Sequence, residues 1–304
     1  MLAIMASKDI SQRFVLENSN IRGELTRLQV SYQQVISKGD YPDVINHLLG
    51  ELMAATVLLS STLKFRSHLS IQASGDGYLK MIMAECGNDK RIRAIAKVSS
   101  NIPMPEETKP TLKQLLGNGQ LVITIHPDKG ERYQGIVPLR NAALSKCLET
   151  YFKRSEQVPT RLFLFCQSGR AGGMLLQMLP TQNSAKKKFE NPVADHWNRA
   201  CLLTETLTTE ELLSMPSKRI LHRLYDGDDV RLFDEKKVQF HCHCSHERVQ
   251  QAFMSLPTDE LKELLTSHKP LSARCEFCNT AYEIEKKDLE SKLSFASAKL
   301  SAIH

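Results

Sequence analysis

The chain has 304 residues, of which 41% are hydrophobic and 24% are charged, and it contains eight cysteines. These proportions are ordinary for a soluble globular protein, and the length allows more than one domain. No apolar run approaches the ~20 residues that a membrane-spanning helix needs, and the first residues lack the pattern of a signal peptide. We therefore expect a cytoplasmic protein, in which cysteines serve as ligands, redox groups or small core residues more often than as a static disulfide framework.

The net charge of +6 is spread unevenly along the chain. Residues 1–182 contain 22 Lys and Arg against 15 Asp and Glu, whereas residues 238–304 contain 8 against 9. A zinc-binding domain that binds nucleic acid carries a basic surface. The C-terminal segment is instead slightly acidic, which argues against nucleic acid as its partner.

Residues 1–182 are predicted to form a mixed α+β core domain. Residues 44–64 have the length of a helix and are apolar around most of its surface, which indicates a buried helix. Apolar residues alternate on both sides of a turn in residues 78–98 and again in residues 121–139, and this is the pattern of a β-hairpin. A further helix and two strands are predicted at residues 141–157, 160–166 and 172–179.

Residues 183–237 are predicted to form a helical linker. A polar stretch bounded by prolines, residues 180–192, overlaps its start and indicates an exposed connection. Thr208 and Glu211 have the spacing of a capping box, and a later helix presents one apolar face. That face consists of Ile220, Leu221, Leu224 and Tyr225. Residues 225–237 are predicted as a charged turn. Short helices of this kind are marginal alone and depend on docking against a neighbouring surface.

Residues 238–304 are predicted to form a small zinc-binding domain with a weakly structured tail. Two tight pairs of thiols, Cys242-x-Cys244 and Cys275-x-x-Cys278, lie on either side of an amphipathic helix predicted at residues 256–270. Two such pairs that converge in the fold supply the four ligands of a tetrahedral zinc site. Four thiolates favour zinc over Ca²⁺ or Mg²⁺, although ligand type alone leaves iron open.

Three histidines flank the first cysteine pair and offer an alternative ligand set. His241, His243 or His246 could replace one thiol in a Cys₃His site. We favour the four cysteines, and His243 in particular lies between two of them and cannot easily bind the same metal. The other four cysteines are expected to be small core residues, and they are Cys86, Cys147, Cys166 and Cys201.

Zinc could have either of two roles in such a site. Four protein ligands leave no open position for water, so catalytic zinc is not expected. In the simpler interpretation, zinc only folds a segment that has few apolar residues. In the other, the site is a redox switch, because metal-bound thiolates are deprotonated and the thiolate is the form that oxidants attack. Cys275 and Cys278 have the spacing of dithiol redox sites, whereas a Cys242–Cys244 disulfide would close a very small, strained ring.

The chain resembles the redox-regulated chaperones of the heat-shock protein thirty-three family, which are bacterial holdases. The two cysteine pairs carry the resemblance at the C-terminal end. Five further stretches agree, namely SGDGYLK (74–80), YQGIV (133–137), YFKRSEQVPTRLFLF (151–165), AGGMLLQMLP (171–180) and TETLTTEELL (204–213). The resemblance covers residues 10–290, and we note one departure at Tyr78, where the family often has proline.

The resemblance implies a cytoplasmic, ATP-independent chaperone that holds unfolding client proteins and is not an enzyme. It implies one Zn²⁺ per chain in the reduced, inactive form, with Cys242, Cys244, Cys275 and Cys278 as ligands. Oxidants, usually with heat, would form the disulfides Cys242–Cys244 and Cys275–Cys278, release zinc and unfold the zinc domain, so that the linker exposes an apolar client surface. The resemblance also implies a homodimer when oxidised and transfer of clients to ATP-dependent foldases, with neither nucleic acid nor membrane as partner.

Two other functions remain open on the residues alone. A zinc-ribbon protein that binds nucleic acid or acts in translation would share the cysteine spacing, but the slightly acidic C-terminal segment argues against it. A thiol oxidoreductase could use Cys275 and Cys278, although no thioredoxin-like βαβ pattern surrounds that pair.

Overall fold

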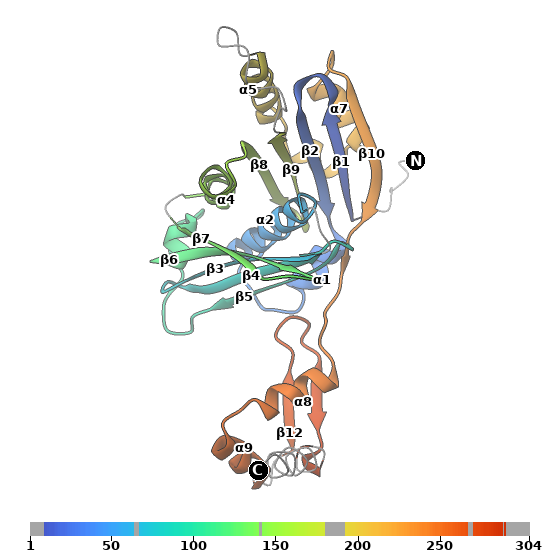
Figure 1. The fold of residues 1–304 in the computed structure, drawn as a ribbon. Helices are drawn as coiled ribbons and strands as arrows, with labels where there is room; N and C mark the ends of the chain where they lie inside the picture. The colour runs from blue at the N-terminus through green and yellow to red at the C-terminus, as the bar shows by residue number, and fades with distance from the viewer. Residues whose placement is uncertain are drawn as a thin grey trace, which may run out of the picture. The chain divides into compact units, whose positions relative to one another are not determined.

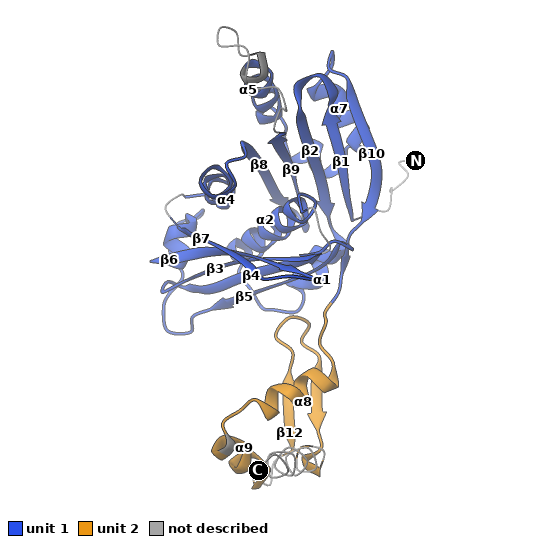
Figure 2. Cartoon of the chain, viewed as in Figure 1, with its two compact units in different colours: residues 1–241 blue, residues 242–304 orange. Residues whose placement is uncertain are grey.

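The structure is a computed structural model, and it describes residues 9–63, 67–139, 142–179, 192–266, 270–287 and 289. The chain divides into two compact units (Figure 2): unit 1 spans residues 1–241 and unit 2 spans residues 242–304. Both units mix helices and strands, so the predicted α+β class is confirmed. The predicted division into residues 1–182, 183–237 and 238–304 stays a prediction.

The first sheet of unit 1 has five strands in the order β10-β1-β2-β9-β8 (Figure 1), and every neighbouring pair is antiparallel. Its strands are β1 (Ile10–Leu16), β2 (Ile21–Leu28), β8 (Thr160–Gln167), β9 (Arg170–Met178) and β10 (Val230–Lys237), and the short helix η1 (Glu17–Ser19) joins β1 to β2. The predicted strands at 160–166 and 172–179 are confirmed as the β8–β9 hairpin.

The second sheet of unit 1 has six strands in the order β11-β5-β4-β3-β6-β7. Its strands are β3 (Ser67–Gly75), β4 (Leu79–Gly87), β5 (Arg91–Val98), β6 (Gly119–Pro127), β7 (Tyr133–Pro138) and β11 (Gln239–Phe240). Both predicted hairpins are confirmed, as β4–β5 and β6–β7. The short strand β11 is parallel to β5, and the chain continues from it directly into unit 2.

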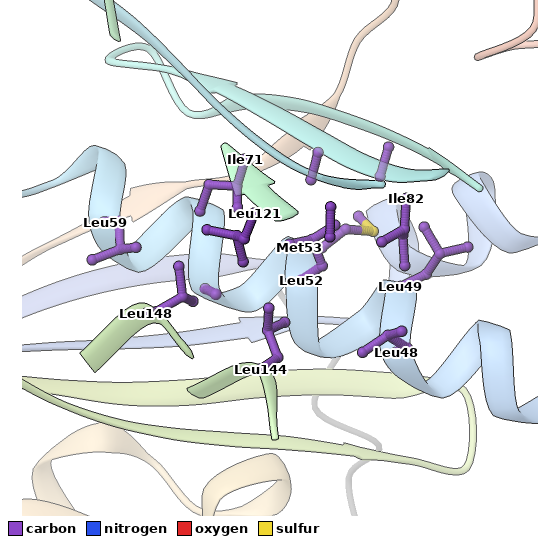
Figure 3. Close-up of a cluster of buried hydrophobic side chains, with 14 of the residues drawn as sticks. Leu48, Leu49, Leu52, Met53, Leu59, Ile71, Ile82, Leu121, Leu144 and Leu148 are labelled. Atoms are coloured by element: carbon purple, nitrogen blue, oxygen red, sulfur yellow. The ribbon is translucent and has the colours of Figure 1, made fainter. Parts of the chain in front are cut away.

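Helix α2 (Asp43–Ser60) lies between the two sheets (Figure 1) and forms the centre of the main core. Figure 3 shows Leu49, Leu52 and Met53 of α2 among side chains from the second sheet, such as Ile71 and Ile82. This helix is long and apolar enough to cross a membrane by length and composition, but most of it is buried inside unit 1. The predicted buried helix is therefore confirmed as a core element.

Among the described residues, four smaller helices accompany α2 in this part of unit 1. They are α1 (Val30–Ile36), α3 (Leu112–Leu116), α4 (Leu144–Tyr151) and the π-helix η2 (Phe152–Glu156). The helix predicted at 141–157 is thus confirmed as α4 continued by η2. The amino end of α1 is capped from outside the helix, because the buried carboxylate of Asp9 accepts hydrogen bonds from the backbone N–H groups of Gln29, Val30 and Ser31.

Three helices cover the face of the first sheet that points away from α2. They are α5 (Pro192–Glu205), α6 (Thr209–Ser214) and α7 (Ser217–Leu224). The capping box of Thr208 and Glu211 is confirmed at the start of α6, and the apolar face predicted for α7 is buried. It packs against Phe14 and Met174 of the sheet, and the rings of Phe14 and Tyr225 lie 6.0 Å apart. We call this layer the helical cover, residues 192–225.

The predicted charged turn at residues 225–237 is wrong for most of its length, because residues 230–237 form the edge strand β10. Charged side chains are typical of edge strands, where they discourage pairing with other chains, and they hid the strand pattern. Arg231 pairs with Glu17 at 2.8 Å, while Val230 and Leu232 pack against the core beneath the helical cover. The predicted connection at residues 180–192 lies outside the described residues, except for Pro192.

The SGDG stretch has a structural role at the β3–β4 turn. A side chain on Gly75 or Gly77 would collide with the backbone carbonyls of Leu116 or Leu115, at 2.0 and 2.5 Å from the added carbon. The carboxylate of Asp76 accepts a hydrogen bond from the backbone N–H of Asn118 at 2.7 Å. The stretch therefore ties the β3–β4 turn to the segment between α3 and β6.

Within the described residues of unit 2, two helices and one small hairpin have defined bounds. They are α8 (His246–Met254), α9 (Thr258–Thr266), and the antiparallel strands β12 (Leu271–Arg274) and β13 (Ala281–Ile284). The predicted helix at 256–270 is confirmed in its central part as α9. The buried core of this unit is small, and its described members are Leu261, Leu271, Ile284 and Leu289.

Candidate metal centre

The four cysteines of the two tight pairs come from two structural elements of unit 2. Cys242 and Cys244 lie just before α8, whose first turn is capped by the Ser245 hydroxyl accepting from the Arg248 N–H at 3.3 Å. Cys275 and Cys278 lie in the turn that joins β12 to β13. This turn is closed by the Asn279 N–H donating to the Cys275 carbonyl at 2.7 Å, so one tight loop holds both residues of the second pair.

The four sulfur atoms form one cluster, in which all lie within 4.8 Å of one another. Cys242 Sγ and Cys275 Sγ are 3.6 Å apart, and Cys244 Sγ and Cys278 Sγ are 3.3 Å apart. In a tetrahedral zinc site with Zn–S bonds of about 2.3 Å, neighbouring sulfurs are about 3.8 Å apart. The four thiols are free and partly exposed, and their spacing fits a metal ion held by four sulfurs.

The alternative Cys₃His set finds no support among the described residues, where the cluster contains cysteines alone. His241 belongs to unit 1, and its backbone N–H donates to the carbonyl of Ile92 at 3.0 Å. His246 Nε2 lies 3.2 Å from the carbonyl oxygen of Glu283, which gives this ring a partner outside the cluster.

Two hydroxyl groups that were not predicted from the sequence contact the cluster, one from Tyr282 in β13 and one from Thr280 just before it. The Tyr282 hydroxyl donates to Cys244 Sγ at 3.0 Å, and the Thr280 hydroxyl lies 3.2 Å from Cys278 Sγ. Hydrogen bonds to ligating sulfurs orient the ligands and tune the metal. The only signal for them in the sequence is their spacing, because Thr280 and Tyr282 are two and four residues after Cys278 and so fall on the same face of an extended segment.

The thiols differ in acidity when the cluster holds no metal. Burial raises the pKa of Cys242 to about 12 and also raises the pKa of Cys244. Burial acts in the same direction on Cys278, but hydrogen bonds from Thr280 and from the neighbouring thiols lower its pKa to about 6. The hydrogen bond to Cys244 raises the pKa of Tyr282 to about 12, so this hydroxyl keeps its proton.

The other four cysteines are buried in unit 1, which confirms their prediction as core residues; they are Cys86, Cys147, Cys166 and Cys201. Burial raises the pKa of Cys166 and of Cys201 to about 11. Cys201 lies on α5, within the helical cover. None of the four takes part in the metal cluster.

The chain thus combines a two-sheet α+β unit with a small unit that carries a four-cysteine cluster. The family profile described as "Hsp33 protein" matches residues 9–285. A 33 kDa chaperonin of Shewanella sediminis is 41% identical over 292 residues, which cover 96% of this chain and 98% of the relative. A 33 kDa chaperonin of Enterobacter sp. is 39% identical over 306 residues, 99% of this chain and 100% of the relative. The chain therefore belongs to the Hsp33 family.

A solved structure has the same fold. The crystal structure of the 33 kDa chaperonin (heat shock protein 33 homolog) from Thermotoga maritima matches with a TM-score of 0.78 at 17% sequence identity. The match covers 95% of this chain and 99% of that chain. At this identity the likeness establishes the fold alone.

Proposed function

We propose that this chaperone of the Hsp33 family is a redox-regulated, ATP-independent holdase, inactive while its thiols are reduced and metal-bound. The observation that carries the proposal is the convergence of four free thiols in one cluster of unit 2, with all sulfurs within 4.8 Å. Membership of the family supports the chaperone activity. The cluster supplies the chemistry by which an oxidant would control that activity.

The metal is Zn²⁺, one ion per chain, held by Cys242, Cys244, Cys275 and Cys278. Zn²⁺ bound by four thiolates is a closed structural site, which stabilises the fold around it and leaves no position for catalysis. Unit 2 needs this stabilisation because the buried core described for it is small. Together with the chaperonin names of its relatives, this closed site supports the proposal that the protein is not an enzyme.

Oxidation converts the ligands into disulfides. One molecule of peroxide takes two electrons from a pair of thiolates, so that one S–S bond forms, the O–O bond breaks, and the oxygen atoms leave as water after taking up protons. Two such steps give Cys242–Cys244 and Cys275–Cys278. These disulfides no longer bind metal, and unit 2 loses the free energy of folding that the metal supplies.

The helical cover is the element that opens in the active state. Its three helices are short and depend on the first sheet for their stability. Release of the cover would expose the apolar residues that it shields, among them Phe14, Leu25 and Met174, and such a surface binds unfolding clients. The helical cover and Cys242 are joined along the chain by β10 and β11. Unfolding around the cysteine cluster can therefore act on the cover through this connecting segment.

The partners that follow are unfolding client proteins, a second copy of the chain in the oxidised state, and ATP-dependent foldases that receive the clients. We place the protein in the cytoplasm, where thiols stay reduced until stress raises the oxidant level. Neither nucleic acid nor a membrane is proposed as a partner.

Light scattering from a heat-unfolding client tests the proposal. The reduced, zinc-loaded chain and the chain treated with peroxide and warmth are compared at equal concentration, with Leu202→Ala, which alters an exposed residue of α5, as a control that leaves the cluster and the buried face of the cover intact. Only the oxidised forms of both proteins should suppress aggregation, and zinc should appear in solution as activity rises. Equal suppression by both forms would reject the redox switch, and no suppression by either would reject the chaperone activity.

Peptide mapping of the oxidised chain tests the pairing separately. The sulfurs of Cys242 and Cys275, and those of Cys244 and Cys278, lie 3.6 and 3.3 Å apart in the reduced cluster, so the pairing must be measured. Disulfides within each sequence pair are expected, and disulfides between the pairs would contradict the proposed products.

A further inference from the structure

A cavity of about 510 Å³ opens at the C-terminal end of α2, between the two sheets of unit 1. Its apolar walls come from α2, the second sheet and η2, and include Leu59, Leu69, Ile123, Ile125 and Phe152. Its volume is typical of sites for small molecules, which measure roughly 300–1,000 Å³. The cavity belongs wholly to unit 1 and uses none of the four clustered cysteines.

One wall of the cavity carries a positioned cation. Arg22 Nε donates to Gln177 Oε1 at 2.8 Å, and a second N–H of the same guanidinium donates to the same oxygen. Gln177 is only 2% exposed, and its amide nitrogen donates to the Thr160 hydroxyl at 2.9 Å. A buried amide, fixed at both ends, thus holds the guanidinium at the cavity wall.

No carboxylate forms an ion pair with Arg22 among the ion pairs of the described residues. Glu24, two residues along the same strand, acts on Arg22 through its charge without a direct ion pair, and its carboxylate accepts hydrogen bonds from the hydroxyls of Ser11 and Ser61. Burial lowers the pKa of Arg22, so its charge is poorly solvated. A partly buried cation beside apolar walls is stabilised most by an anion that brings apolar surface with it.

The acidic residues at the cavity come from other elements and are exposed. Glu131 lies in the β6–β7 turn. Glu156 ends η2 and accepts a hydrogen bond from the Tyr151 hydroxyl at 2.8 Å. Both carboxylates can therefore remain hydrated at the rim, whereas the guanidinium of Arg22 is held at the wall by Gln177.

We propose that this cavity binds a fatty carboxylate, with its hydrocarbon chain against the apolar walls and its head on the guanidinium of Arg22. A planar carboxylate suits the donor fork of arginine, which forms short, charge-assisted hydrogen bonds. A hydrocarbon of the same length with a neutral or cationic head would give the guanidinium of Arg22 no direct anionic partner. The proposal is independent of the redox switch.

Calorimetric titration with dodecanoate tests the proposal, using the reduced, zinc-loaded full chain and ligand below its micelle concentration. One site per chain is expected, and dodecanol and dodecyltrimethylammonium should bind at least tenfold more weakly. Arg22→Met should weaken dodecanoate binding about 10- to 100-fold, the range that loss of a charge-assisted hydrogen bond produces. Arg154→Met, which removes an exposed arginine of η2 outside the cavity lining, should bind as the unchanged chain does.

Methyl NMR of the isoleucines locates the ligand without any substitution. Dodecanoate should shift the methyl signals of Ile123 and Ile125, which line the cavity, and leave that of Ile220 beneath the helical cover unchanged. If Arg22→Met fails to fold, Arg22→Lys replaces it in the titration, and the methyl shifts of the unchanged chain still show whether the ligand occupies this cavity. The proposal is overturned if dodecanoate does not bind, if dodecanol binds equally well, if Arg22→Met binds unchanged, or if Ile220 shifts instead.

Discussion

The Tyr282 hydroxyl donates a hydrogen bond to Cys244 Sγ across 3.0 Å, from β13 to the residue pair that precedes α8. A donor to a ligating sulfur stabilises the thiolate and fixes the direction of its lone pairs. Tyr282 therefore connects Cys244, a member of the first cysteine pair, to the hairpin that carries the second pair, Cys275 and Cys278. It is a positioning residue, which acts on the metal through Cys244.

Tyr282→Phe removes this donor and leaves the aromatic ring in place. We expect zinc affinity to fall about 10- to 100-fold, as is typical when a hydrogen-bond partner of a metal ligand is lost. Zinc transfer to a competing chelator measures the change. Tyr78→Phe, which alters a tyrosine of unit 1, should leave zinc affinity unchanged. An unaltered transfer curve for Tyr282→Phe would show that the hydrogen bond does not act on the bound metal.

Cys278→Ser removes one of the four ligands. A serine hydroxyl is a poor replacement for a thiolate at zinc, so the zinc content of the purified chain should fall well below one per chain. The methyl NMR signals of Leu271 and Ile284 in unit 2 should lose chemical-shift dispersion. Unit 2 would unfold without the metal because its described hydrophobic core is small. Atomic absorption measures the stoichiometry, with Cys201→Ala as the control that keeps full zinc content. Unchanged zinc content in Cys278→Ser would remove this residue from the ligand set.

The sequence predicts the cluster well and its surroundings poorly. The four cysteines stand in two tight pairs, and such spacing is specific enough to predict convergence without any knowledge of the fold. Tyr282 was missed because its contact depends on the β12–β13 register, in which Tyr282 pairs with Ala273. Single-sequence patterns do not fix such a register when both strands are short.

The fold of unit 1 shows the same contrast between local and long-range information. The hairpin around residues 88–90 and the capping box of Thr208 were predictable because both depend on neighbours in sequence. β10 was missed because it forms by pairing with β1, far away in the chain, and its charged residues mimic a turn. The Arg22 cavity was also missed, since its lining is assembled from separate elements of both sheets.

Alkylation of the buried cysteines reports on the helical cover. In the reduced, zinc-loaded chain, Cys166 and Cys201 should resist iodoacetamide at pH 7.5, because burial raises their pKa values to about 11 and the thiolate is the reactive form. If oxidation releases the cover, Cys201 on α5 becomes exposed, its pKa falls toward the ordinary value, and its reactivity rises. Cys166 lies in β8 and should remain protected.

Mass spectrometry of the alkylated peptides measures both sites in one sample. A rise at Cys201 alone would establish selective opening of the helical cover. Equal labelling of Cys166 and Cys201 would indicate global unfolding, and a Cys201 that stays protected after full activation would exclude α5 from the opening.

Leu221→Ala tests whether the helical cover is what keeps the reduced chain inactive. Leu221 is buried on α7 against the first sheet, and truncation of a buried leucine typically costs about 2–5 kcal/mol. The closed state should lose this free energy, while the open state, in which Leu221 is exposed, should lose little. The reduced variant should therefore suppress client aggregation without peroxide and should still bind one zinc. Leu202→Ala is the matched control, since Leu202 on α5 is 64% exposed, and it should stay inactive until oxidised. A reduced Leu221→Ala protein that is folded, destabilised and still inactive would show that another element shields the client surface.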